Sequence, residues 1–143
     1  MEQMTPLMDA AAANITAATR LLIESGAKME ALNKLGITAL FYTIRSNSHG
    51  PLAILLEAGA DHRHISIIKG TILRFVALTG DIETMRILAD LDLEGVDAGF
   101  RDRAGLTVAQ VFGQRTGVTD ELREAFLNLV ARNHSVSFET LRC

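Results

Sequence analysis

The sequence predicts an all-α solenoid, in which helix-turn-helix units stack in a row and hairpin-like fingers join them. The first observation is a repeat: "RLLIESGA" at 20–27 returns 33 residues later as "AILLEAGA" at 53–60. The second is a Thr-x-Leu triplet at 5–7, 38–40 and 71–73, again at steps of 33 residues. Internal repeats of roughly 20–50 residues are typical of stacked repeat architectures.

The first unit contains the expected signals for two helices. Thr5 is the expected N-cap of the first helix, and Pro6 takes the first helical position, where its missing N–H does no harm. Gly26 is expected to end the second helix, because glycine tolerates the left-handed backbone conformation. An apolar stripe with helical spacing precedes it, at Ala18, Leu21 and Leu22.

The later units follow the same plan. The second has a helix start at Gly-Pro 50–51 and a stop at Gly59, the third an N-cap at Asp81, and the fourth an N-cap at Thr119. Their apolar helical positions are Leu52, Leu55 and Leu56, then Ile82, Met85 and Leu88, then Leu122, Ala125, Phe126, Leu129 and Val130. The triplet's Thr recurs at Thr107, 36 residues after Thr71, so we place three additional residues around "LEGVDAGFR".

Composition argues against several partner classes. The net charge is −3 and the sequence has 5% aromatic residues and no Trp, which disfavours a nucleic-acid-binding surface. No apolar run approaches the roughly 18–20 residues of a membrane span. Cys143 is the single cysteine, which fits a reducing compartment, and the N-terminus lacks the pattern of a targeting signal. We expect a cytoplasmic or nuclear protein that binds neither nucleic acid nor membrane.

Motifs for chemistry are missing from the sequence. It has no Gly-rich phosphate loop and no HExxH. His62 and His64 follow Asp61, but zinc takes three or four ligands, and no further Cys or His is close. Cys143 and His134 lie at the end of the chain, a poor place to hold catalytic geometry. We therefore expect no enzyme activity and no catalytic, cofactor-binding or metal-binding residues.

On these motifs the sequence resembles the ankyrin repeat family over roughly residues 4–132. The shared features are Thr-Pro-Leu, a small pair, then Gly or Asn, and a helix that ends Leu-Leu-x-x-Gly-Ala. The resemblance implies an ankyrin repeat domain over residues 1–132, followed by a C-terminal tail at 133–143 that we expect to dock in part. The repeats implied are about 4–36, 37–69, 70–104 and 105–132.

The sequence departs from the family at the brace between repeats. The family usually has a His after Thr-Pro-Leu, and that His bonds the Thr and braces adjacent repeats. We expect this brace to be absent and apolar packing to replace it in part. The residues that stand in its place are Met8, Phe41, Arg74 and Gln110. The last repeat is atypical, and its polar outer side is expected to close the stack. The polar residues there are Arg123, Glu124, Asn128 and Arg132.

The resemblance also implies a function. Ankyrin proteins usually bind another protein through the concave surface of their fingers and inner helices, so we expect a protein–protein interaction module or adaptor for an unidentified protein. One alternative is a fragment of a larger multidomain regulator. The other is an enzyme or small-molecule binder that uses the groove, for which an enclosed pocket with converging polar groups would be the sign.

The stretch "HRHISIIKG" at 62–70 locates the expected binding surface. It has isoleucines where the family has a polar Asp-x-x-Gly turn, with Gly70 one position late. A hairpin tip has two faces and little protein above it, so we do not expect all three isoleucines to be buried. Burial of one Ile contributes about 1.5–3 kcal/mol, which exposed isoleucines can supply to a complex.

We predict that Ile67 and Ile68 form the centre of this surface. Tyr42 is expected to face the groove because its hydroxyl prefers some water, and Phe75 faces either groove or core. The residues predicted to bind the partner are Lys34, Leu35, Tyr42, Arg45, Ile65, Ile67, Ile68, Lys69, Phe75 and Arg103.

A second expected surface is the N-terminal edge. No finger precedes the first unit, and Met4, Met8 and Ala11 to Ala13 are expected to be exposed there. Because a free solenoid end normally carries a polar outer face, we expect this repeat either to form a homodimer or to abut further repeats.

Overall fold

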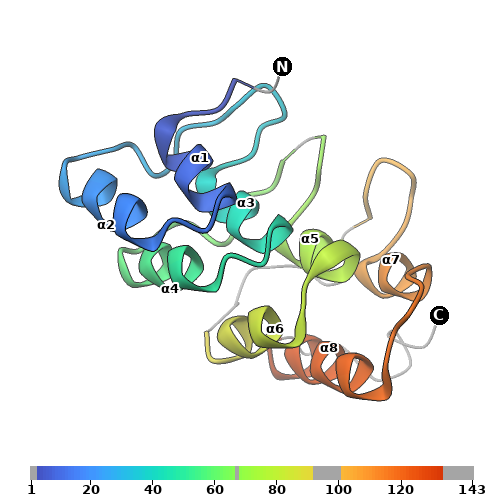
Figure 1. Ribbon diagram of the computed structural model, residues 1–143. Coiled ribbons are helices and arrows are strands. Elements are labelled where there is room, and N and C mark those ends of the chain that lie inside the picture. Colours follow the sequence, from blue (N-terminus) through green and yellow to red (C-terminus); the bar gives the residue numbers. More distant parts are fainter. Residues whose placement is uncertain (1–2, 67, 92–100, 134–143) are drawn as a thin grey trace.

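The computed structural model describes residues 3–66, 68–91 and 101–133 (Figure 1). These residues form eight α-helices and no named strand, so the all-α expectation is confirmed for this part of the chain. The helices are α1 (Pro6–Ala12), α2 (Thr16–Glu24), α3 (Ala39–Arg45), α4 (His49–Glu57), α5 (Ile72–Thr79), α6 (Ile82–Ala89), α7 (Val108–Gly113) and α8 (Asp120–Asn133). Within the described ranges, no helix is both long and apolar enough to cross a membrane.

The helices lie in two layers, as Figure 1 shows. An inner layer contains α1, α3, α5 and α7 in this order, each in contact with the next, and an outer layer contains α2, α4, α6 and α8 in the same way. Extended connections leave the inner layer on one side. We call them the first finger (28–37), the second finger (61–70) and the third finger, described over 101–106.

The helix ends lie where local sequence signals place them. Thr5 Oγ1 accepts a hydrogen bond from the Met8 N–H at 3.2 Å, and Asp81 Oδ1 accepts one from the Thr84 N–H at 2.8 Å. Thr119 caps α8 in the same manner, through the Leu122 N–H at 3.1 Å. The residues after α2 and α4 turn at Gly26 and Gly59, whose φ angles are +89° and +87°. The three N-caps and both glycine stops are confirmed.

The core lies between the two layers and runs their whole length. α3 is buried from Ala39 to Ile44, because α1, α5 and α4 surround it. Leu55 on α4 is fully buried, as the apolar stripe predicts. At the far end, the rings of Phe112 and Phe126 stack at 4.1 Å and join α7 to α8. Each helix pair is therefore stabilised mainly by its neighbours.

The expectation for Leu21 is wrong. Its side chain is 63% exposed, although the apolar pattern places it on the buried stripe of α2. The reason is that, among the described residues, α2 is the first helix of the outer layer and packs mainly on α1 and α4. One side of the apolar stripe therefore packs on neighbouring helices, whereas the side with Leu21 is exposed. Leu22 contacts the core instead.

The N-terminal edge also differs from the expectation. Met8 and Ala11 are buried in the core, and Met8 Sδ accepts a hydrogen bond from the Thr5 N–H at 3.5 Å. Burial follows because α1 packs on α3 and α2 through this side. Ala13 is exposed as expected, and the large exposed apolar side chains of this region are Ile15 and Leu21. A homodimer through the first repeat stays a prediction.

Polar contacts join the second and third helix pairs. Asn47 takes a left-handed φ of +51° in the turn between α3 and α4, and its Oδ1 accepts hydrogen bonds from the Asp81 N–H at 2.8 Å and the Thr84 hydroxyl at 2.9 Å. His49 Nε2 lies 2.9 Å from both carboxylate oxygens of Asp81. Burial raises the pKa of Asp81, but hydrogen bonds from Thr84 and His49 outweigh it and hold the pKa below its ordinary value.

Two predicted features fall outside the described residues. The additional residues around "LEGVDAGFR" lie at 93–101, of which only Arg101 is described. The tail at 133–143 is described only at residue 133, as the last residue of α8.

Candidate partner-binding surface

The first and third fingers contain the same hairpin turn. Asn33 Oδ1 accepts hydrogen bonds from the N–H groups two and four residues later, at 3.0 and 3.2 Å. Asp102 Oδ1 does the same, at 2.9 Å in both cases. Such side chains stabilise turns by replacing a backbone acceptor. Asp102 thus opens the turn of the third finger as Asn33 opens that of the first.

The second finger has a different turn because its glycine comes late. Ser66 and Gly70 exchange both backbone hydrogen bonds at 2.9 Å, and Gly70 has a φ of +84°. Lys69 therefore stands where the first finger has Gly36. Ser66 Oγ accepts from the N–H of Lys69 at 2.9 Å and donates to the Leu35 carbonyl at 2.6 Å. The altered turn thus fastens the second finger to the first.

Two further polar contacts hold the fingers in place. His64 Nε2 donates to the Gly36 carbonyl at 2.7 Å, between the first and second fingers. Arg74 on α5 donates through Nε to Asp102 Oδ2 at 3.0 Å and through Nη1 to the Lys69 carbonyl at 3.4 Å, so it joins the second finger to the third. These contacts fix the spacing of the three fingers.

Arg74 adds a polar contact to the apolar packing expected in place of the His brace. It stands at one of the brace positions, and its ion pair with Asp102 joins α5 to the third finger. Burial raises the pKa of Asp102, but the Leu106 N–H, the Arg74 guanidinium and the Ala104 N–H outweigh it, and the pKa is held below its ordinary value. Apolar packing is therefore not the sole replacement for the missing His.

At the second and third units the absence of the His has a visible consequence. The hydroxyl oxygens of Thr38 and Thr71 are buried and have no hydrogen-bond partner within the described residues. Thr5 and Thr107 differ, because Met8 Sδ and Gln110 Oε1 accept from their N–H groups while their own hydroxyls cap the helix. An unpaired buried hydroxyl is a cost to stability.

Two of the three predicted isoleucines are described, and both lie on the second finger. Ile65 is 43% exposed and Ile68 is 40% exposed, so the expectation that the three isoleucines are not all buried is confirmed. Ile67 lies outside the described residues. Ile65 and Ile68 line a tip groove of about 270 Å³ between the first and second fingers, together with Leu32 and Lys34.

A second hollow, the inner groove, has a volume of about 170 Å³ and lies under the fingers, against α3 and α5. Its apolar lining consists of Leu35, Ile37, Phe75 and Leu78, and its cations are Arg45, Lys69 and Arg74. Leu35 belongs to both grooves. Leu78, which is 43% exposed, was not predicted to belong to this surface. It lies three residues after Phe75, so helical spacing on α5 is the signal that could have identified it.

The expectation that Tyr42 faces the groove is wrong. Its side chain is 3% exposed, and its hydroxyl accepts a hydrogen bond from Asn33 Nδ2 at 2.7 Å. The Asn33 side chain thus gives the Tyr42 hydroxyl the polar partner that water was expected to provide. Phe75 serves both roles considered for it, because its ring packs edge-on against Phe41 at 5.1 Å and also lines the inner groove. Arg103 is exposed on the third finger, and the described lining of neither groove includes it.

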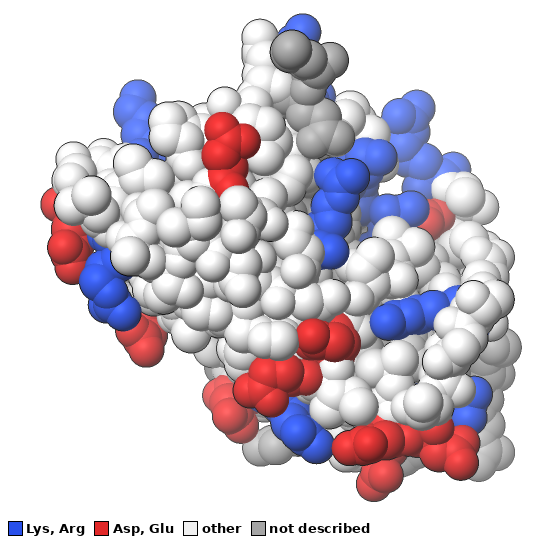
Figure 2. Space-filling model, in the orientation of Figure 1, with Lys and Arg blue, Asp and Glu red and all other residues white. Residues whose placement is uncertain are grey.

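Charge is unevenly distributed over this face of the molecule. Figure 2 shows Lys and Arg side chains gathered at the upper right, over the fingers beside α5 and α7, and Asp and Glu side chains around α6 and α8 below. The described lining of the inner groove has three cations and no carboxylate. Arg74 is paired with Asp102, and Arg45 and Lys69 are the other two cations of this lining.

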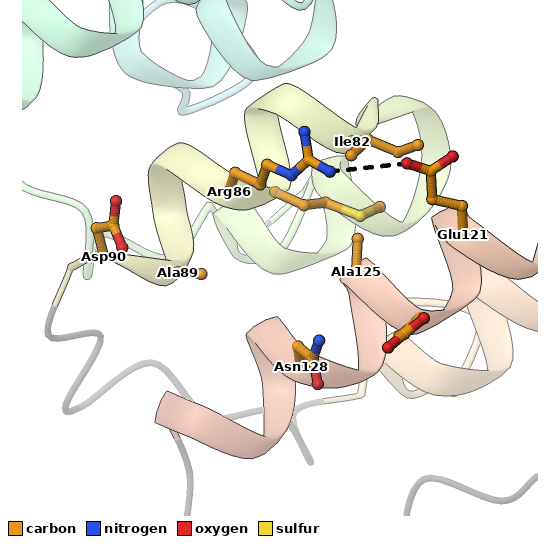
Figure 3. Close-up of a pocket in the computed structure, with 9 residues that line it drawn as sticks. Ile82, Arg86, Ala89, Asp90, Glu121, Ala125 and Asn128 are labelled. Atoms are coloured by element: carbon orange, nitrogen blue, oxygen red, sulfur yellow. Dashed lines mark ion pairs between the residues drawn. The ribbon is translucent and has the colours of Figure 1, made fainter.

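A third hollow lies in the outer layer, between α6 and α8 (Figure 3). It has a volume of about 570 Å³, and the buried Met85 forms part of its floor. Arg86 and Glu121 face each other across it at 3.7 Å, and both side chains are largely exposed. Exposed pairs of this kind contribute little binding or folding energy. Glu124 and Asn128, expected on the polar outer side of the last helix, line this hollow.

These observations describe two small grooves on the finger side and one open hollow on the outer side. Within the ranges that the structure describes, no group of three or more His, Cys, Asp or Glu side chains is placed to hold a metal ion. Comparison with known proteins finds no family model and no curated protein that matches the sequence.

Proposed function

We propose that this chain is an ankyrin-repeat solenoid of about four repeats, over residues 1–132, that acts as a protein–protein interaction module or adaptor. Several features support the fold assignment. They are the 33-residue repeat, the contacts between successive helices of each layer, the left-handed glycines after α2 and α4, and the hairpin fingers. The partner is an unidentified protein, bound through the fingers and inner helices.

One observation supports the functional proposal most strongly. Ile65 and Ile68 are both exposed at finger tips that are fixed by hydrogen bonds to the neighbouring finger. Exposed Leu32 lines the same tip groove. A contiguous apolar patch rimmed by polar residues is typical of a protein interaction site. Its fixed geometry reduces the entropy lost on binding.

The sizes of the grooves favour a protein partner over a small molecule. Sites for drug-sized ligands usually measure about 300–1,000 Å³ and enclose most of the ligand. The tip groove and inner groove, at about 270 and 170 Å³, are below this range. The hollow between α6 and α8 is large enough, at about 570 Å³, but its Arg86 and Glu121 side chains extend into water. Membership of a larger multidomain regulator is compatible with this proposal.

The proposal can be tested by capture with matched surface variants. The protein would be immobilised, exposed to native lysate, and its bound proteins identified by mass spectrometry. The double variant Ile65→Asp, Ile68→Asp should lose the captured protein. The control variant Leu21→Asp places the same change on an exposed leucine of α2, away from the fingers, and should retain it. Equal capture by both variants, with unchanged melting, would refute the proposed surface.

A further inference from the structure

The inner groove is a preformed site for one large apolar side chain. Its volume of about 170 Å³ is close to that of cavities of about 150 Å³ that admit a benzene ring. Leu35, Ile37 and Phe75 supply apolar walls, and the half-exposed Leu78 forms an apolar edge. A groove of this size accommodates a single leucine, methionine or phenylalanine side chain of a bound peptide.

The rim of this groove is positively charged. Arg45 lies 5.9 Å above the ring of Tyr42, which holds the guanidinium at the end of α3. Lys69 is fixed through its backbone, because its N–H donates to Ser66 and its carbonyl accepts from Arg74. Two more exposed cations, Arg101 and Arg103, lie on the third finger. The chain as a whole carries a net charge of −3, so this local excess of cations opposes the average charge of the molecule.

Local positive charge on a negative protein selects an acidic partner. Complementary charge accelerates association and disfavours partners of the wrong sign. The acidic side chains around α6 and α8 would repel such a partner from the other side of this face (Figure 2). The fingers are also held by the Ser66–Leu35 and Arg74–Asp102 contacts, so binding requires little ordering of the site.

We infer that the inner groove binds an extended acidic segment of the partner protein, with one large apolar residue flanked by Asp or Glu. The apolar side chain enters between Phe75 and Leu78, and the flanking carboxylates pair with Arg45 and Lys69. This inference rests on the proposed function and specifies the chemistry of the partner. A single-stranded nucleic acid is the competing polyanion, but the apolar lining of the groove favours a peptide.

Synthetic peptides can test this inference directly. The probe is a fluorescein-labelled Gly-Asp-Glu-Asp-Phe-Asp-Glu-Asp-Gly peptide, and its binding is measured by fluorescence anisotropy at low and high salt. Replacing the Phe by Ser, or the acidic residues by Lys, should weaken binding at least about tenfold. Binding of the acidic peptide should also weaken as salt rises. Equal binding of the acidic and basic peptides, or displacement of the probe by an equimolar poly-dT oligonucleotide, would overturn the inference.

Protein variants locate the site. Lys69→Glu and Leu78→Asp should each weaken the binding of the acidic peptide at least about tenfold. Arg123→Glu reverses a charge on the exposed side of α8 and should leave binding unchanged. Melting curves check that each variant is folded, and Lys69→Gln, which removes the charge without reversing it, should give an intermediate loss. Equal effects of Lys69→Glu and Arg123→Glu would contradict this site.

The same variants separate this inference from the proposed function. One outcome is that the double variant Ile65→Asp, Ile68→Asp loses capture from lysate while the single variants Lys69→Glu and Leu78→Asp retain it. In that case the proposed interaction surface stands and the inference of an acidic segment fails. If none of these variants changes capture, the proposed function itself fails.

Discussion

The ion pair between Arg74 and Asp102 allows the contribution of one contact between α5 and the third finger to be measured. Asp102→Asn is the suitable change, because it removes the charge and preserves the turn. The first finger supports this choice, since Asn33 occupies the same place and accepts the same two backbone N–H groups. Any loss of stability therefore reports on the contact with Arg74.

The expected magnitude follows from the burial of the two side chains. Asp102 is 6% exposed and Arg74 is 27% exposed, so the pair is largely withdrawn from water. A hydrogen bond to a charged group contributes about 1.5–3 kcal/mol. Arg74 can regain part of this from water, and we expect Asp102→Asn to lower the free energy of unfolding by about 1–2 kcal/mol at pH 7. Urea titration followed by circular dichroism measures this difference.

The pH dependence gives a second test. The pKa of Asp102 is lower in the folded protein than its ordinary value, so the charged form stabilises the fold. This contribution is complete above the pKa of the unfolded chain, about 3.9, and is lost as pH falls through the lower folded pKa. The difference between wild type and Asp102→Asn should be constant from about pH 8 to 6 and should shrink below about pH 4.

The control is Asp120→Asn, because Asp120 pairs with Arg123 but is fully exposed. It should leave stability at pH 7 almost unchanged. Equal stability of wild type and Asp102→Asn at pH 7, or a difference that does not vary with pH, would refute the view that this ion pair stabilises the contact between α5 and the third finger.

Two further predictions concern the packing between layers and units. Leu55→Ala removes a fully buried side chain from α4 and should cost about 2–5 kcal/mol, whereas Leu21→Ala, the same deletion at an exposed site on α2, should cost under about 0.5 kcal/mol in urea titrations. Similar losses for the two would contradict the layered core. Gly50→Ala would place a Cβ against Thr16 Oγ1 in the contact between α2 and α4. Overpacking should cost about 1–3 kcal/mol, with at most about 1 kcal/mol returned by helix propensity, and Thr16→Ala in the same chain should restore most of the loss. Failure of Thr16→Ala to restore stability would place the cause elsewhere.

The sequence by itself determined the features that depend on a few neighbouring residues. Thr5, Asp81 and Thr119 cap their helices through N–H groups three residues later. Gly26 and Gly59 end helices because the backbone there is left-handed, a conformation that costs most other residues free energy. The apolar period around Leu55 is likewise local, and the buried side of α4 follows from it. Hydrogen-bond geometry and steric exclusion within one helical turn decide such features without reference to the rest of the chain.

Only the tertiary structure decided which of these surfaces meet another part of the chain. Leu21 is exposed because, among the described residues, α2 packs mainly on α1 and α4, and Tyr42 is buried because Asn33 reaches its hydroxyl. Arg74 holds the third finger because Asp102, 28 residues later, comes to lie beside its guanidinium. The inner groove forms in the same way, from two fingers and two helices. The physical reason is that burial and pairing energies depend on distances between atoms, and residues far apart in sequence come within contact distance only after the helix pairs have stacked.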